Sequence, residues 1–91
     1  MRTEPHEERI LLIDDDPDDV ELTSGALRKM NAHGSITIAR MAEEGLTLAG
    51  QQNWTMIFLD HKLPGKNGRE VLPEIRLLAP EAGIVILTGH E

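Results

Sequence analysis

The sequence contains no cysteine and no tyrosine, and its 91 residues include only one tryptophan and one phenylalanine. Without cysteine the chain can form neither a disulfide framework nor a cysteine-ligated metal site. Small secreted domains usually depend on disulfides for their stability, so the absence of cysteine favours a reducing cytoplasm. A chain of this length predicts one small domain that buries a limited share of its surface.

Long apolar runs are missing as well. The longest run extends over only four or five residues, so no membrane-spanning segment is predicted. The charged N-terminus has no apolar stretch of signal-peptide length. Lysine and arginine together number 9 against 16 acidic residues, which leaves a net charge of −7. Because phosphate backbones select clusters of basic residues, direct binding of nucleic acid is not expected.

Four short apolar segments are present, and each is nearly continuous rather than alternating, as in strands that are buried on both faces. Between them, apolar residues recur every three or four positions, which is typical of amphipathic helices. Strands that alternate with helices predict an α/β fold with a parallel sheet and right-handed crossovers. The predicted strands are 10–13, 36–39, 56–59 and 84–87, and the helical positions are Val20, Thr23, Leu27 and Met30, then Ala42, Leu46 and Ala49, then Val71, Ile75 and Leu78.

Three local features refine this prediction. Asp16 followed by Pro17 predicts the N-cap and the first residue of the first helix. Trp54, just before the third strand, is expected to pack in the core or at its edge. The methionines are interpreted as core fillers, namely Met30, Met41 and Met56.

Polar residues that could react or bind a metal follow three of the four strands. Asp14 and Asp15 follow the first strand, Asp60 the third and Thr88 the fourth. Ligands of open parallel sheets bind beyond the carboxyl ends of the strands, and neighbouring strands lie only about 5 Å apart. Carboxylates brought so close repel each other and raise each other's pKa, and a hard divalent cation such as Mg²⁺ relieves that repulsion. The spacing therefore predicts a metal site that serves a phosphorylated ligand.

Three motifs, in this order, resemble those of response regulator receivers, the family of the bacterial chemotaxis response regulator. They are ILLIDDDP at 10–17, IFLDHKLPGKNG at 57–68 and IVILTG at 84–89. They resemble the first strand with its acidic loop, the phosphoacceptor strand with its loop, and the fourth strand with its switch hydroxyl. The resemblance implies a flavodoxin-like, doubly wound sheet with the strand order second, first, third, fourth. Residues 1–91 are thus expected to form one receiver domain of four strands and three helices.

The resemblance also implies roles for individual residues. Asp60 would accept a phosphoryl group from a histidine kinase or a histidine phosphotransfer protein in a cytoplasmic two-component phosphorelay. Asp15 would bind Mg²⁺ (or Mn²⁺) directly, Asp14 mainly through water, and Lys62 through its backbone carbonyl. Thr88 would hydrogen-bond to a phosphoryl oxygen and move toward it. The chain would then be a regulatory phosphoacceptor, with at most self-phosphorylation and self-dephosphorylation, rather than an enzyme.

The family's last helix–strand–helix segment, with its lysine and its aromatic switch residue, has no counterpart in these 91 residues. The segment 84–87 is therefore expected to form an edge of the sheet. Apolar edge strands recruit other strands. The hypothesis that follows is either that two copies self-associate through this edge, by strand pairing or swapping, or that the chain is a remnant of a longer protein.

Two other functions stay open at this point. Phosphatases of the haloacid dehalogenase type place an Asp-x-Asp after the first strand, which Asp14 and Asp16 would supply, and a threonine after a later strand, which Thr88 would supply. That scheme gives Asp60 no role, and it predicts turnover of phosphate esters. A receiver-like module that is not phosphorylated would serve only for docking or dimerisation, and it would not bind Mg²⁺.

Overall fold

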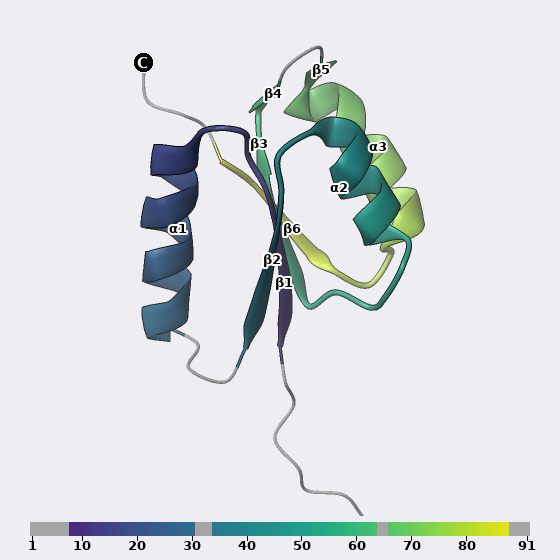
Figure 1. Cartoon of the computed structure of the whole chain (residues 1–91). Coiled ribbons are helices and arrows are strands. Elements are labelled where there is room, and N and C mark those ends of the chain that lie inside the picture. The colour runs from purple at the N-terminus through teal and green to yellow at the C-terminus, as the bar shows by residue number, and fades with distance from the viewer. Residues whose placement is uncertain (1–7, 31–33, 64–65, 88–91) are drawn as a thin grey trace, which may run out of the picture.

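A computed structural model describes residues 8–30, 34–63 and 66–87, the side chains of residues 66 and 67 excepted. Four strands form one parallel sheet in the order β2-β1-β3-β6. α1 covers one face of this sheet, and α2 and α3 lie together on the other face (Figure 1). The doubly wound α/β fold and the implied strand order are thus confirmed. The elements are β1 Arg9–Ile13, α1 Pro17–Met30, β2 Ser35–Ala39, α2 Ala42–Ala49, β3 Met56–Asp60, β4 Lys62–Leu63, β5 Lys66–Asn67, α3 Gly68–Leu78 and β6 Gly83–Leu87.

The four strands of the parallel sheet match the predicted apolar segments, and each is one residue longer than predicted. The continuous apolar pattern was informative because helices on both faces bury both sets of side chains. The sequence did not predict β4 and β5, which pair antiparallel just after β3. Two residues per strand are too few to produce a recognisable periodicity.

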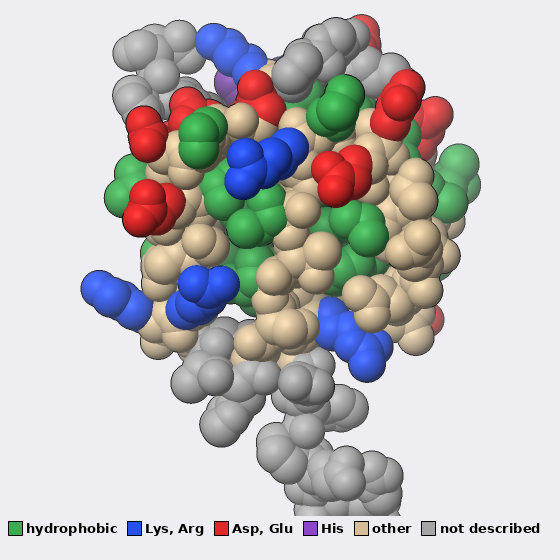
Figure 2. Space-filling model, in the orientation of Figure 1, with side chains coloured by type: hydrophobic (Ala, Val, Ile, Leu, Met, Phe, Trp, Pro, Cys, Tyr) green, Lys and Arg blue, Asp and Glu red, His purple; other side chains and the backbone are tan. Residues whose placement is uncertain are grey.

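The start of α1 agrees with the predicted N-cap. The side-chain Oδ1 of Asp16 accepts hydrogen bonds from the backbone N–H groups of Asp18, at 2.9 Å, and Asp19, at 3.4 Å. The helix carries acidic residues in its first turn and basic residues, Arg28 and Lys29, in its last. Figure 2 shows this separation, with red side chains near the top of α1 and blue ones near its lower end. Both charge placements oppose the partial charges of the helix ends and so stabilise the helix.

The main core lies between the sheet and the pair formed by α2 and α3. Alternate residues of β1 and β3 supply its sheet side and are fully buried, and α3 contributes Val71 and Ile75. Trp54 is buried in this core, and its indole Nε1 donates a hydrogen bond to the carbonyl of Leu48 at 2.9 Å. The predicted packing role of Trp54 is therefore confirmed. The fully buried residues of the two strands are Leu11, Ile13, Ile57 and Leu59.

The interpretation of the methionines as core residues is wrong for two of them. Met30 is 81% exposed and Met41 is 54% exposed. Met30 is the last residue of α1 and Met41 stands just before α2, so both lie at helix ends rather than on a packed face. Leu78, placed on the apolar face of the third helix, is also 46% exposed at the end of α3. Only Met56 is partly buried, with its sulfur against Gly83.

The opposite face of the sheet packs toward α1. The register aligns Leu12, Phe58 and Val85 across three strands, and these residues alternate with those of the main core. Leu12 is fully buried, whereas Val85 on the outer strand β6 is 37% exposed. The side chains on this face of the sheet are therefore less completely covered toward β6. No helix in the described part of the chain is long and apolar enough to cross a membrane.

Candidate functional site

The carboxyl ends of β1 and β3 bring together the three aspartates that the sequence placed there. Asp14, Asp15 and Asp60 each offer one carboxylate oxygen within 4.8 Å of the other two. Ile13 pairs with Leu59 in the parallel ladder, so the residues that follow them emerge side by side. Asp14 is 2% exposed and Asp60 is 9% exposed, whereas Asp15 is exposed. The cluster thus has two buried carboxylates and one at the surface.

Backbone hydrogen bonds hold the two buried aspartates in place. The N–H of Asp14 donates to the carbonyl of Ala39 in β2 at 2.9 Å, and its Oδ1 accepts from the N–H of Asp16 at 3.0 Å. Oδ1 of Asp60 accepts from the N–H of Lys62 at 3.3 Å. Each carboxylate therefore closes a short turn with the backbone two residues ahead, a conformation that aspartate favours. The orientation of both side chains is set before any ligand binds.

The environment of Asp14 disfavours its charged form. Burial, the largest cause, raises the pKa of Asp14 from its usual value near 3.8 to about 6. The backbone N–H of Asp16 opposes this effect, whereas the charges of Asp60 and Asp19 and a side-chain hydrogen bond with Asp60 add to it. Such a site gains free energy when a cation neutralises the carboxylates. An all-oxygen set of ligands suits a hard divalent cation such as Mg²⁺, Mn²⁺ or Ca²⁺.

An open hollow gives solvent access to Asp60. Its volume is about 800 Å³, and it lies between the first turn of α1 and the end of β3. The space is wide enough for a phosphoryl group and part of its donor. Its lining consists of Asp15, Asp16, Pro17, Asp18, Asp19, Asp60 and Lys62.

The chain turns tightly behind Asp60, and this turn requires glycine at residue 68. The N–H of Gly68 donates to the carbonyl of His61 at 2.8 Å. A Cβ at residue 68 would lie 2.9 Å from the Cα of His61 and 3.0 Å from the carbonyl oxygen of Asp60. Because both contacts are with backbone, only glycine fits here without displacing the backbone of Asp60 and His61.

His61 itself is only partly buried, but its ring nitrogen Nδ1 is enclosed. No hydrogen-bond partner for Nδ1 is found in the described part of the chain. The N–H of His61 donates to the carbonyl of Leu87 at 3.1 Å, which ties the end of β3 to the end of β6. The backbone of His61 thus positions the turn behind Asp60.

The remaining predicted site residues divide into two groups. Lys62 opens β4 and lines the hollow beside Asp60, while the role of its carbonyl as a metal ligand stays a prediction. Thr88 lies outside the described residues.

Sequence reasoning missed the electrostatic influence of Asp19 on Asp14. The available signal was its position in the first turn of a helix that starts directly beside the cluster.

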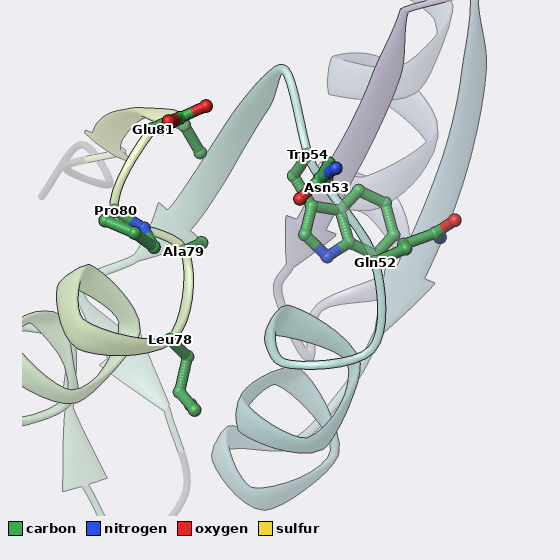
Figure 3. Close-up of a pocket in the computed structure, with 8 residues that line it drawn as sticks. Gln52, Asn53, Trp54, Leu78, Ala79, Pro80 and Glu81 are labelled. Carbon is green, nitrogen blue, oxygen red and sulfur yellow. The ribbon is translucent and has the colours of Figure 1, made fainter.

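A second cavity has a volume of about 420 Å³ (Figure 3). The segments after α2 and after α3 form it, with Trp54 and Pro80 among its lining residues. Both segments lead into the amino ends of β3 and β6, which are opposite to the ends where Asp60 stands. Glu81 is its one charged lining residue, so the cavity offers no counterpart to the acidic cluster.

Comparisons with known proteins agree with this fold. A family model described as "Response regulator receiver domain" matches residues 10–91. A response regulator receiver protein from an Anaeromyxobacter species is 29% identical over 82 residues, which are 90% of this chain and 34% of that protein. The chain therefore spans about a third of the length of such curated relatives, as with a transcriptional regulatory protein of Bacillus subtilis, of which it covers 34%.

Solved structures with the same fold include response regulators with a phosphorylated aspartic acid, with bound metal ions and with a histidine kinase. A Burkholderia pseudomallei response regulator with a phosphorylated aspartic acid, a calcium ion and citrate has a TM-score of 0.81 and 26% identity over 93% of this chain and 49% of that one. A Thermotoga maritima response regulator in complex with Mg²⁺-BeF has a TM-score of 0.80 and 34% identity over 92% of this chain and 71% of that one. The same Thermotoga protein in complex with a histidine kinase has a TM-score of 0.78 over the same shares of the two chains.

Proposed function

This chain belongs to the response regulator receiver family of two-component signalling, and from that premise we propose that Asp60 accepts a phosphoryl group in a Mg²⁺-dependent reaction. The convergence of Asp14, Asp15 and Asp60 within 4.8 Å carries the proposal. The open hollow beside Asp60 supports it, since a phosphodonor must reach that carboxylate from solvent.

The proposed chemistry is the transfer of a phosphoryl group from a phosphohistidine to Asp60. A carboxylate oxygen of Asp60 forms a bond to phosphorus while the bond between phosphorus and the imidazole nitrogen of a phosphohistidine breaks. The nitrogen keeps the electron pair of that bond and takes a proton from water. The hydrogen bond from the N–H of Lys62 holds the carboxylate of Asp60 in one orientation. This reduces the entropic cost of aligning that carboxylate with the phosphorus atom.

Asp14, Asp15 and Asp60 would hold the cation, with the carbonyl of Lys62 as a further ligand. When bound, Mg²⁺ supplies positive charge that offsets the charge of the phosphoryl oxygens. The raised pKa of Asp14 supports this assignment, because a cation would relieve the buried repulsion. Thr88, which follows β6, would donate its hydroxyl to a phosphoryl oxygen.

A haloacid-dehalogenase-type mechanism is less compatible with the geometry. It requires Asp14 and Asp16 as the reacting pair, but the cluster contains Asp15 and not Asp16. The carboxylate of Asp16 is occupied as the N-cap of α1. The third function, a docking module without phosphorylation, differs from the proposal only in chemistry, so experiment must separate the two.

The experiment is incubation with Mg²⁺ and acetyl phosphate, followed by intact-mass measurement. We expect a mass gain of one phosphoryl group in the wild-type chain, and no gain in Asp60→Asn or when EDTA removes the metal. Asp16→Asn, which keeps a capping oxygen outside the cluster, should still gain the group. Absence of any gain under all conditions contradicts the proposal and leaves the docking function.

For the natural phosphodonor we propose a histidine kinase or a histidine phosphotransfer protein in the cytoplasm. A similar response regulator has been solved in complex with a histidine kinase. The chain's fold matches that protein with a TM-score of 0.78, so the surface around Asp60 has a comparable framework. Transfer of labelled phosphate from a phosphorylated kinase to Asp60 tests this partner directly.

We also propose that two copies associate through β6. The N–H of Gly83 donates to the carbonyl of Thr55 at 3.0 Å, so Gly83 and, by alternation, Val85 direct their backbone groups toward β3. Ile84 and Ile86 then direct theirs to the outer edge, where no strand pairs within the described residues. β6 has no lysine, proline or bulge that would protect such an edge.

The sequence of β6 suits antiparallel self-pairing. With Val85 on a two-fold axis, Ile84 of one copy faces Ile86 of the second copy, and each such pair exchanges two hydrogen bonds. This register is the one in which both strands present their outward backbone groups to each other. The pairing also places the two partly exposed Val85 side chains next to each other, which buries apolar surface.

A further inference from the structure

The first turn of α1 carries two carboxylates that phosphorylation of Asp60 does not require. Asp18 and Asp19 line the same hollow as Asp60, which has a volume of about 800 Å³. Asp18 is exposed and Asp19 is half-buried. The charge of Asp19 helps raise the pKa of Asp14, so this turn lies within electrostatic reach of the buried cluster. Any ligand that approaches Asp60 through the hollow passes these two side chains.

The charge of the hollow is strongly unbalanced. Its lining holds five aspartates and a single lysine. One bound divalent cation would neutralise about two of the negative charges, and the rest of the chain adds to the negative field with its net charge of −7. A small phosphodonor with two negative charges is therefore repelled on its way to Asp60. A protein that presents basic side chains is attracted by the same field.

The side chain that caps the start of α1 differs from the two side chains, Asp18 and Asp19, that line the hollow at this turn. Oδ1 of Asp16 binds the backbone N–H groups of Asp18 and Asp19 and so closes the helix. The carboxylates of Asp18 and Asp19 accept no hydrogen bond within the part of the chain that the structure describes. Their charges can thus be removed while the cap remains. The favourable effect of acidic residues at a helix start is a purely structural alternative, and it predicts a change in stability alone.

We infer that Asp18 and Asp19 select the phosphodonor of this receiver. They disfavour small, doubly anionic phosphodonors, and they favour a phosphohistidine on a protein that directs lysine or arginine side chains toward the first turn of α1. The inference rests on the proposed phosphorylation of Asp60 and adds the class of donor to it.

The test compares two small donors on wild type and on Asp18→Asn/Asp19→Asn at saturating Mg²⁺. With acetyl phosphate the bond between phosphorus and the acetate oxygen breaks and acetate leaves with the electron pair; with phosphoramidate the phosphorus–nitrogen bond breaks and ammonia leaves. Phosphoramidate carries less negative charge near neutral pH. At low salt we expect the initial rate with acetyl phosphate to rise about three- to tenfold in the variant, and the rate with phosphoramidate to rise less. Added NaCl should raise the wild-type rate with acetyl phosphate and reduce the difference.

A matched control changes the net charge by the same amount far from the hollow. Glu74→Gln/Glu81→Gln alters two exposed residues, one on α3, which covers the face of the sheet opposite α1, and one after α3, and its rates should stay near those of wild type. Equal rates for wild type and the aspartate variant, or the same increase for both donors, would overturn the inference while Asp60 still gains its phosphoryl group. If no variant gains that group from either donor, the proposed function itself has failed.

Discussion

Asp14 and Asp60 lie side by side at the ends of β1 and β3, and a hydrogen bond between their side chains contributes to the raised pKa of Asp14. The two residues are far apart in the sequence, and the parallel ladder alone brings them together. Two buried carboxyl groups in contact favour a shared proton or a bound cation.

The first prediction concerns pH and the Asp14→Asn variant in the absence of metal. The pKa of Asp14 is about 6 in the folded chain and near 3.8 when unfolded, so the protonated group stabilises the fold. That contribution is fully present below pH about 4 and is lost as the pH rises through about 6. At pH 7.5 the variant should therefore exceed wild type by roughly 2 kcal/mol in free energy of unfolding, with little difference at pH 4. Urea titrations followed by Trp54 fluorescence measure this, and a difference independent of pH would contradict it.

The second prediction separates metal binding from helix capping. Mg²⁺ should raise the melting temperature of wild type, because it binds the folded cluster and not the unfolded chain. Asp15→Asn should abolish most of that increase with little effect on the metal-free protein, since Asp15 is exposed. Asp16→Ala should lower metal-free stability by about 1 kcal/mol through loss of the cap and keep the increase. Thermal unfolding with and without Mg²⁺ would refute the assignment if the two variants behaved alike.

The third prediction concerns the turn behind Asp60. Gly68→Ala should destabilise the chain by about 1–3 kcal/mol, because its Cβ would meet the backbone of Asp60 and His61 and neither can move freely. Gly25→Ala, on α1 with nothing within 4 Å of its added Cβ, should instead stabilise by about 0.5–1 kcal/mol. Urea denaturation of both variants provides the comparison. Equal effects of the same sign would show that helix propensity, and not the turn, governs residue 68.

The fourth prediction concerns association through β6. If two copies pair with Val85 on the axis, Val85→Lys places two ammonium groups next to each other and should convert a dimer into a monomer. Leu22→Lys is the control, because Leu22 is 73% exposed on α1 and lies away from the edge. Size-exclusion chromatography with light scattering distinguishes the species. A wild-type chain that stays monomeric at high concentration, or a dimer unaffected by Val85→Lys, argues against this interface.

Much of the fold could be read from local pattern. The four strands of the parallel sheet were predicted because parallel strands between two helical layers are apolar on both faces, and the start of α1 was predicted from Asp16 and Pro17. The convergence of Asp14, Asp15 and Asp60 was predicted too, since parallel strands place their carboxyl ends at one edge of the sheet. The exposure of Met30 and Met41 was not, because a methionine at a helix end looks the same in sequence as one on a packed face.

The amino-acid sequence by itself thus determined the order of the three helices and the four strands of the parallel sheet, and the edge at which the aspartates meet. Only the tertiary structure decided the pKa of Asp14, the influence of Asp19 on the cluster and the need for glycine at residue 68. These properties depend on burial and on distances between segments that are remote in the chain. Local periodicity indicates which face of a helix or strand a residue occupies. It does not indicate which residues of other segments lie opposite that residue after folding.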